Sequence, residues 1–484
     1  MMITHTTTQR YILLVTTLSS FLTPFMGSAV NVALPAIAKD LSMTALSLSW
    51  VATSFILAAT MTLIPLGRLA DIHGRKRFYV YGGLIFTVAS SFCILSPSQL
   101  FLIAARAVQG IGGAMIFSTG TAMLVSAYPL EERGKIIGIN IAAVYIGLTI
   151  GPFVGGLLTQ HLGWRFIFLF TAAWGLIITL IATTIKEEWS AINGKRFDFN
   201  GSLLYAISLF SIIYGLSQLP SLNALFLIGM GILCLILFIV YELKNPYPLV
   251  DVHLFLNNKV FAFSNLAALI NYCATFAITF LLSLYLQQIK MLTPSQTGSI
   301  LVAAPVVQAL LSPLAGRLSD RIEPQIISST GMVLTVIGLV PLIFLTSETS
   351  IEYVLFCLVL LGVGFALFSS PNVNAIMSAV EKKYYGVASA TVGTMRLTGQ
   401  MFSMGITMLI FAVILGDYPI SDANSYLLLK STNFIFAILA IICCIGIFAS
   451  LARGKMHNPT GGRFFKHSKP AAPTGGGATG NNNH

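Results

Sequence analysis

The sequence carries very little charge, and acidic residues are the scarcer kind. Charged side chains occupy 9% of the 484 positions, with 16 Asp and Glu against 27 Lys and Arg. Hydrophobic residues reach 56%, above the roughly 45–50% that is usual in soluble domains. So little charge argues against a soluble globular chain and indicates a protein that crosses a lipid bilayer many times.

Cysteine and histidine are also few, and they form no pattern. The six cysteines fall inside apolar runs, without the spacing of a metal site or of a secreted disulfide framework. No group of His, Asp, Glu or Cys converges at the depth of a span, so the sequence predicts neither an enzyme nor a metal or other cofactor site. A selectivity-filter loop or a ring of charge, which would suggest a channel, is also lacking.

The net charge of +11 does not indicate a nucleic-acid partner. Nucleic-acid binding needs basic residues gathered on one soluble surface, and here they sit in short loops between apolar runs. We therefore expect no nucleic acid among the partners, and membrane lipids and a small-molecule substrate instead.

The apolar residues form fourteen runs, each about as long as the roughly 20 helical residues that cross a hydrocarbon layer. Because the bilayer offers no hydrogen-bond partner to bare backbone, each run is predicted to be a helix. The runs lie near 11–34, 47–70, 78–95, 99–127, 135–159, 164–185, 199–219, 222–241, 260–287, 295–316, 325–346, 351–376, 384–415 and 430–452.

Basic residues divide unequally between the two sides of these spans. Arg106 and Arg396 lie within spans. Of the other 25 Lys and Arg, twenty-one fall in loops on one side of the spans. Four fall on the opposite side: Lys39, Arg165, Lys290 and Lys430. Positive charge gathers in cytoplasmic loops, and an even number of spans puts both termini on one side. We expect both termini to be cytoplasmic, in a cell membrane.

Parts of the first half of the chain recur in the second half. GRLADIHGRKR, from Gly67, is matched by GRLSDRIEPQI, from Gly316, at an offset of 249 residues. QGIGGAMIFSTGTAM, from Gln109, is matched by LGVGFALFSSPNVNA 252 residues later, and Gly134 and Gly386 keep that spacing of 252. Two related halves are the sequence sign of a transporter built from repeats around a central cavity.

The repeat predicts how the chain is divided. Six spans per half leave two over, near 199–219 and 222–241, as an inserted helical hairpin. We expect an N-terminal six-helix bundle over residues 1–190, the hairpin within 191–250, a C-terminal six-helix bundle over 251–455 and a cytoplasmic tail over 456–484. The tail ends in the low-complexity run PAAPTGGGATGNNNH, whose composition predicts disorder.

At these motifs the chain resembles the major facilitator superfamily, specifically its fourteen-helix drug:proton antiporter branch of the multidrug efflux type. The matching positions are Gly67, Leu69, Asp71, Gly74, Arg75 and Lys76 in a loop, Arg106, Gln109, Gly110 and Gly113 in the fourth span, and Gly147, Gly151, Pro152, Gly155 and Gly156 of the exporter signature GLTIGPFVGG. The resemblance extends from about Tyr11 to Arg453. It implies an all-α membrane protein, two six-helix bundles with an inserted hairpin, that works as a monomeric, secondary-active exporter by alternating access.

The loop motif also has a direct physical interpretation. Its glycines let two helices approach and a very short turn close. The Asp71 carboxylate can accept backbone NH groups at a helix N-terminus or pair with Arg75, interactions that exist in one conformation and break in another. The resemblance implies gating of the cytoplasmic side, so we predict a pair of latches: Gly67, Asp71, Gly74 and Arg75 in the first copy and Gly316, Asp320 and Arg321 in the second. For the basic residues, a purely topological role is the alternative.

Polar residues inside the spans are candidates for lining the transport path. They are Asn31, Arg106, Gln109, Tyr145, Asn271, Gln308, Asn372, Asn374, Arg396 and Gln400. For each, an ordinary interhelical hydrogen bond is the alternative, and Arg106 could be satisfied by carbonyls and Gln109. The glycines and proline of the exporter signature predict close helix packing with a kink, and the resemblance implies that this face shapes the cavity.

One position departs from the family pattern. FMGSAVNVALP, from Phe25, has Met26 where proton-coupled members carry an acid, and none of the 16 acids lies at the middle of a span. A cavity with two arginines and no carboxylate disfavours organic cations and favours neutral, amphipathic or anionic cargo. We expect an exporter of small amphipathic, drug-like molecules, with an exporter or flippase of anionic or lipid-like metabolites without carboxylate-based proton coupling as the alternative. Protons are candidate partners only through Asp71, Asp320 or a titrating substrate.

Overall fold

The structure is a computed structural model that describes residues 7–129, 132–189, 197–319, 321–381, 385–416 and 425–454. Its described part is helical, without strands, and has 14 helical stretches long and apolar enough to cross a membrane. The fourteen predicted spans and the all-α class are therefore confirmed. The predicted tail, residues 456–484, lies outside the described residues.

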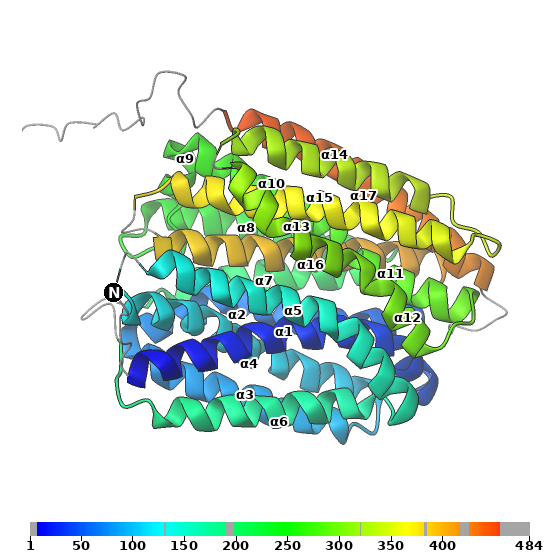
Figure 1. The fold of residues 1–484 in the computed structure, drawn as a ribbon, viewed down its shortest axis with the longest axis horizontal. Helices are drawn as coiled ribbons and strands as arrows, with labels where there is room; N and C mark the ends of the chain where they lie inside the picture. The colour runs from blue at the N-terminus through cyan, green and yellow to red at the C-terminus, as the bar shows by residue number, and fades with distance from the viewer. Residues whose placement is uncertain are drawn as a thin grey trace, which may run out of the picture.

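Six helices form the N-terminal bundle, which occupies the lower half of Figure 1. They are α1 (Thr7–Asp40), α2 (Ala45–His73), α3 (Arg75–Ile94), α4 (Gln99–Ala127), α5 (Arg133–His161) and α6 (Arg165–Thr184). The C-terminal bundle, in the upper half, contains α10 (Lys259–Thr275), α11 (Ala277–Leu284), the π-helical turn η1 (Tyr285–Ile289), α12 (Pro294–Leu301), α13 (Ala303–Ser319), α14 (Pro324–Leu342), α15 (Ile351–Ser378), α16 (Tyr385–Ile414) and α17 (Ser425–Ala452).

Two spans of the C-terminal bundle are broken into consecutive helices, each at an identifiable residue. Pro305 has no NH to give to the carbonyl of Leu301, and α12 ends there before α13 begins. Between α10 and α11 the backbone NH of Ala277 donates instead to Ser403 Oγ of α16, at 3.0 Å. Such breaks are tolerated in lipid because neighbouring side chains satisfy the freed backbone groups.

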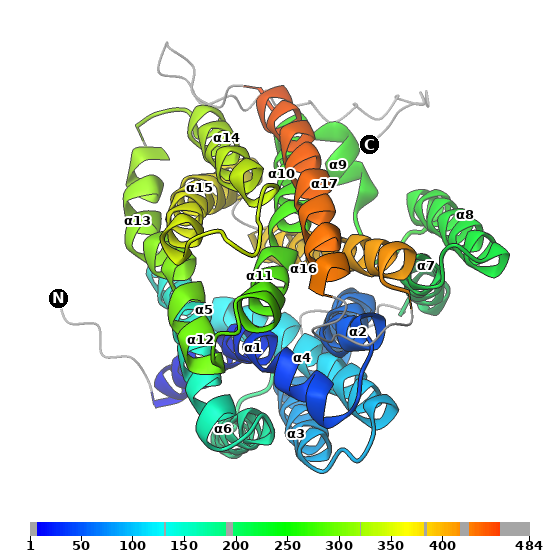
Figure 2. The ribbon, with the colours of Figure 1, turned by 90° about the vertical axis from the view of Figure 1, so that its right-hand side faces the viewer.

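The extra hairpin consists of α7 (Phe199–Ser217) and α8 (Leu222–Lys244), followed by the short α9 (Val252–Asn257). Figure 2 shows both hairpin helices to one side of the two bundles, with α8 outermost. α7 contacts α2 and α16, one helix from each bundle, whereas α8 packs mainly on α7. The apolar outer face of α8 is therefore left to the lipid.

The internal repeat is visible in how the helices pack. In the first half, α3 and α4 cross so closely that a Cβ on Gly112 would stand 2.8 Å from Gly82 O. In the second half, a Cβ on Gly364 would stand 2.9 Å from Gly331 O, where α14 crosses α15. Each glycine pair permits the backbones to touch, a feature of helix packing in membranes. Gly82 and Gly331 are 249 residues apart, and Gly112 and Gly364 are 252 residues apart. The two halves of the repeat thus make the same contact.

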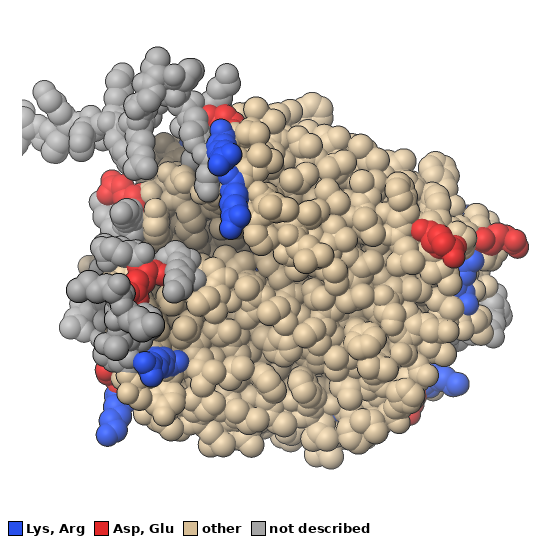
Figure 3. Space-filling model, in the orientation of Figure 1, with Lys and Arg blue, Asp and Glu red and all other residues tan. Residues whose placement is uncertain are grey.

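Charge lies toward the two ends of the molecule, and a broad uncharged band lies between them, as Figure 3 shows for one face. We call the end with the His73–Arg75 turn and Arg453 the basic end, and the end with the Asp40–Ala45 turn the opposite end. At the opposite end Arg165 Nη1 lies 2.6 Å from Asp40 Oδ2, and Trp164 Nε1 donates to the same oxygen at 3.1 Å. The uncharged band matches a protein that faces lipid on its sides.

Candidate transport cavity

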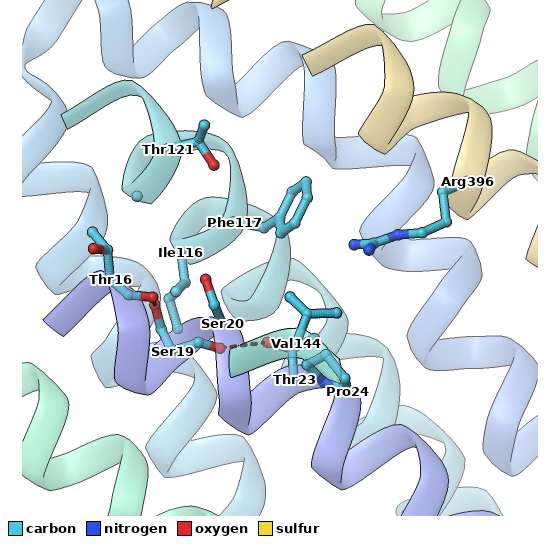
Figure 4. Close-up of a pocket in the computed structure, with 11 residues that line it drawn as sticks. Thr16, Ser19, Ser20, Thr23, Pro24, Ile116, Phe117, Thr121, Val144 and Arg396 are labelled. Atoms are coloured by element: carbon cyan, nitrogen blue, oxygen red, sulfur yellow. Dashed lines mark hydrogen bonds between the residues drawn. The ribbon is translucent and has the colours of Figure 1, made fainter. Parts of the chain in front are cut away.

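A pocket lies between the two bundles in the half of the molecule nearer the basic end. Its walls come from α1, α4, α5 and α16, and it is lined by Thr16, Ser19, Ser20, Thr23, Pro24, Ile116, Phe117, Gly120, Thr121, Val144 and Arg396. Figure 4 shows the α1 hydroxyls on one wall and Arg396 reaching in from α16 on the other. The pocket is polar mainly through hydroxyl groups, which both donate and accept hydrogen bonds.

Arg396 is the cationic side chain of this pocket. Its guanidinium carbon lies 5.0 Å from the centre of the Phe117 ring. The ion pairs found in the described part of the chain do not include Arg396. A cation without a carboxylate partner at this depth attracts an anionic or acceptor-rich ligand.

Arg106 has a different environment, although both arginines were predicted to line the transport path. Only 2% of its surface is exposed, within the N-terminal bundle, and it does not line the pocket. Its Nε donates to Val51 O at 3.1 Å, and its Nη1 donates to Gln109 Oε1 at 2.5 Å. Gln109 in turn donates to Ser90 Oγ at 2.6 Å. These contacts correspond to the alternative in which Arg106 and Gln109 hold α2, α3 and α4 together.

The other predicted polar residues lie at several different places. Asn372 donates to Ser264 O at 3.1 Å, Asn374 to Ser319 Oγ at 2.9 Å, and Gln308 to Ser369 Oγ at 3.3 Å, all within the C-terminal bundle. The buried Asn271 has an Nδ2 with no partner among the described residues. Asn31 is buried, and Tyr145 and Gln400 are half-buried. These three residues are not among those that line the pocket.

The bundles close against each other at the opposite end. A Cβ on Gly156 of α5 would collide with Pro294 O of α12, and one on Gly298 of α12 would collide with Pro152 O of α5. The three hydrogen bonds that join described residues of the two bundles also lie in this half: Gln287 Nε2 to Val32 O (2.8 Å), Ser295 N to Gln160 Oε1 (3.2 Å) and Thr53 Oγ1 to Met408 Sδ (3.4 Å).

The exporter signature therefore has two packing faces on α5. Gly147, Gly151 and Gly155, spaced one helical turn apart, lie where a Cβ would collide with α1. Pro152 and Gly156, also one turn apart, touch the C-terminal bundle instead. One face holds α5 inside its own bundle, and the other forms the contact that closes the opposite end.

The residues predicted to form the first latch lie together at the basic end, inside the N-terminal bundle. Arg75 Nε lies 2.7 Å from Asp71 Oδ1, and Arg75 Nη1 donates to Ser126 Oγ of α4 at 2.6 Å. The other interaction predicted for Asp71, accepting from the NH groups of a helix N-terminus, is made by Glu188 instead. Glu188 accepts from Lys76 N at 2.8 Å. Gly74 has φ 118, a conformation that side chains rarely adopt, and a Cβ there would meet the Glu188 carboxylate.

The residues predicted to form the second latch are described only in part. A Cβ on Gly316 would stand 2.9 Å from Ser370 Oγ, just as one on Gly67 would stand 3.2 Å from Ser118 Cβ. These partners are again 252 residues apart. Arg321 is exposed at the basic end, and Asp320 lies outside the described residues.

The prediction from the sequence missed two sets of residues. Arg453, counted as a loop residue, is 1% exposed and donates to Asn372 Oδ1 at 3.1 Å and to Ser450 O at 2.9 Å. Burial lowers the pKa of Arg453 to about 10, so it keeps its charge at neutral pH. The hydroxyls of α1 were also missed, although Thr16, Ser20 and Thr23 recur at the three- and four-residue spacing of one helix face.

Replacing Asp71 with asparagine is expected to slow turnover more than it weakens substrate binding. The residue touches Arg75 at the basic end and does not line the pocket, so its loss changes the balance between conformations and leaves substrate contacts intact. Binding affinity and maximal transport rate are to be measured on the purified protein. Asp251→Asn, an exposed helix cap at the same end, is the control. If affinity collapses while the rate at saturation is unchanged, Asp71 is not a latch.

Two helical bundles with a cavity between them, crossing the bilayer many times, define a membrane transporter. Residues 16–243 and 265–475 match the family model of the Major Facilitator Superfamily, so the chain belongs to this family. The fold is similar to that of a bacterial homolog of the human lysosomal transporter Spinster in an inward-facing and unoccupied conformation. That likeness has a TM-score of 0.68 at 15% sequence identity and covers 93% of this chain and 98% of the other.

Two curated relatives are similar over most of their length. The chain is 29% identical over 448 residues to the riboflavin transporter RibZ of Clostridioides difficile (strain 630). The matched region covers 91% of this chain and 96% of the relative. The chain is 31% identical over 405 residues to the multidrug resistance protein Stp of Mycobacterium tuberculosis (strain CDC 1551 / Oshkosh), covering 82% of this chain and 75% of the relative.

Proposed function

We propose that this transporter exports small amphipathic molecules from the cytoplasm by alternating access. The observation that carries the proposal is the contrast between the two halves of the interface between the bundles. At the opposite end the backbones of α5 and α12 are in contact through Gly156 and Gly298. Nearer the basic end there is a pocket of hydroxyl groups, Phe117 and Arg396. This contrast supports loading from the basic end.

The basic end is the cytoplasmic end in this proposal. The support is the unequal division of Lys and Arg between the loops, because positive charge gathers in short cytoplasmic loops. The termini then lie in the cytoplasm, and the Asp40–Arg165 ion pair faces the outside. The loops at Asp71 and Gly316 act as latches that form when the cytoplasmic side closes.

The chain divides into bundles at residues 1–190 and 251–455, with the hairpin between them, and works as a monomer.

The cargo is amphipathic, with an aromatic part and a neutral or anionic polar part. Phe117 offers a stacking surface, Arg396 offers a charged donor, and the α1 hydroxyls offer both donors and acceptors. Two relatives, a riboflavin transporter and a multidrug resistance protein, suggest the cargo classes to try first. Riboflavin itself has the expected character, since it joins an aromatic ring system to a hydroxylated chain.

A second candidate function is export or flipping of anionic or lipid-like metabolites without carboxylate-based proton coupling. It is favoured by Arg396, which has no acidic partner among the described residues, and by the absence of any Asp or Glu from the residues that line the pocket. In this case proton coupling runs through Asp71, Asp320 or a titrating substrate, or does not occur.

A transport assay in proteoliposomes with an imposed pH gradient tests the proposal. The probes are riboflavin, an aromatic carboxylate dye and the permanent cation tetraphenylphosphonium. We expect uptake of riboflavin and of the carboxylate to exceed that of the cation, because Arg396 repels a cation from the pocket. Gradient-driven transport of the cation that survives replacement of both Asp71 and Asp320 would refute the charge argument. Transport of a phospholipid probe in place of all three would favour the flippase.

A further inference from the structure

Two carboxyl groups are buried together at the basic end of the inserted hairpin. Neither belongs to the residues that line the pocket. Asp198 immediately precedes α7 and is 7% exposed, and Glu242 lies in the last turn of α8 and is 2% exposed. Acidic residues are seldom buried to this degree unless a partner compensates the charge.

Three of the four carboxyl oxygens have a hydrogen-bond donor. Asp198 Oδ1 accepts from Gly201 N at 2.9 Å, and Asp198 Oδ2 accepts from Asn245 Nδ2 at 2.7 Å. Glu242 Oε2 accepts from Val250 N at 3.1 Å. The fourth oxygen, Glu242 Oε1, is buried and has no hydrogen-bond donor among the described residues.

The oxygen without a donor is directed at the other carboxyl group. Gly201 lies against both acids, and a Cβ placed on it would stand 2.5 Å from Glu242 Oε1 and even closer to Asp198 Oδ2. Both oxygens therefore border the same small space, which only glycine leaves open. Because both oxygens lie within 2.5 Å of the same point, the Glu242 and Asp198 carboxyl groups lie next to each other.

No basic side chain among the described residues compensates this pair. Tyr241, which precedes Glu242 in α8, is exposed. Lys244, Asp251 and His253 are exposed, and Lys195 and Arg196 lie outside the described residues. Two ionised carboxylates at this separation repel each other strongly, so the pair binds a cation of some kind or keeps a proton.

The ligand that fits this site is a proton. A metal cation such as Ca²⁺ or Mg²⁺ takes six or more oxygen ligands. Here the hydrogen-bond partners of the carboxyl oxygens, Gly201 N, Asn245 Nδ2 and Val250 N, are all donors, and a donor cannot bind a metal cation. We propose that Asp198 and Glu242 form a proton-binding site, in which one proton on Glu242 Oε1 is shared with Asp198 in the folded protein at neutral pH.

The shared proton has a structural consequence. Through it, the start of α7, the end of α8 and the connection at 245–250 that leads to α9 are held by one hydrogen-bond network. An ordinary glutamate has a pKa of about 4.3 in an unfolded chain. The folded protein therefore binds one more proton than the unfolded chain above that pH, and its stability decreases as the pH rises and the site loses its proton.

The test is the pH dependence of the apparent melting temperature of the purified full-length protein, followed from about pH 6 to about pH 9. Glu242→Gln keeps the shape, and its amide can donate to Asp198 without a titrating proton. We expect the wild-type melting temperature to fall with rising pH relative to Glu242→Gln, so that the variant is the more stable protein at high pH. Glu352→Gln, an acid near the surface of α15, is the control and should follow the wild type.

Infrared spectroscopy provides the direct reading. At neutral pH the wild type should have the carbonyl band of a protonated carboxyl group, and Glu242→Gln should lack that band. If Glu242→Gln does not fold, Asp198→Asn carries the same test, since asparagine still caps α7 and can donate to an ionised Glu242. Equal pH dependence in the wild type and the folded variant, or a wild-type spectrum without the band, would overturn the proposal. Transport activity enters neither measurement, so the result is independent of the cargo.

Discussion

Replacing Arg396 with alanine is expected to weaken the binding of anionic cargo roughly 10- to 150-fold. This range corresponds to the roughly 1.5–3 kcal/mol of a hydrogen bond to a charged group. The guanidinium lines the pocket beside Phe117 and has no ion-pair partner among the described residues, so its removal leaves no other charge unpaired. The fold should therefore be affected little.

The measurement compares an aromatic carboxylate with its methyl ester, which has the same ring and no charge. Dissociation constants of both compounds are determined for the wild type, Arg396→Ala and Arg396→Lys. We expect the carboxylate to lose affinity in Arg396→Ala, the ester to change little, and Arg396→Lys to fall between, because lysine keeps the charge without the planar fork. Equal losses for acid and ester would mean that Arg396 shapes the pocket and does not bind the anion.

Arg106→Ala is the informative contrast. Its guanidinium is enclosed by Val51, Gln109 and the Phe55 ring, and a carbonyl and an amide oxygen lose their donor when it is removed. Leaving such buried groups unsatisfied costs about 1–3 kcal/mol for each. The variant should therefore be less stable, with acid and ester affected alike. The sequence led us to expect the same effect from both arginines, and the structure separates them.

The sequence was sufficient for the architecture because each apolar run must satisfy its own backbone in lipid. It could not tell Arg106 from Arg396, since each is a single arginine in a long apolar run. The direction of a side chain depends on which helices surround it, and no spacing in one helix contains that information. The same reason explains Glu188. It reaches the N-terminus of α3 from a segment more than a hundred residues further along the chain.

The exporter signature was recognised, but its division into two faces was not. Four glycines and a proline within ten positions predict close packing, and the contacts of α5 with two of its neighbours, α1 and α12, satisfy that prediction. Only the fold assigns Gly151 to the inside of one bundle and Gly156 to the contact between bundles. This distinction matters for the proposed alternating access, in which a contact inside a bundle persists through the cycle and a contact between bundles must break.

Replacing Gly156 with valine is expected to abolish transport by holding the opposite end open. The added side chain would occupy the position of Pro294 O, in the backbone of α12, which has no rotamer with which to move aside. Overpacking of this kind costs about 1–3 kcal/mol, enough to shift a two-state equilibrium by roughly 5- to 150-fold. Gly138→Val is the matched control, since Gly138 lies on the same helix with nothing near its missing Cβ.

The shift can be followed at Thr53, which is buried between the bundles in this conformation and donates to Met408 Sδ. In a background without the six native cysteines, Thr53→Cys should react with an impermeant maleimide added outside cells much faster when Gly156→Val is present. Because the reagent reaches only the outer side, the same result places the opposite end outside the cell. Faster labelling from the cytoplasmic side alone would reverse the orientation. Full transport in Gly156→Val would mean that the contact between α5 and α12 is not the outer gate.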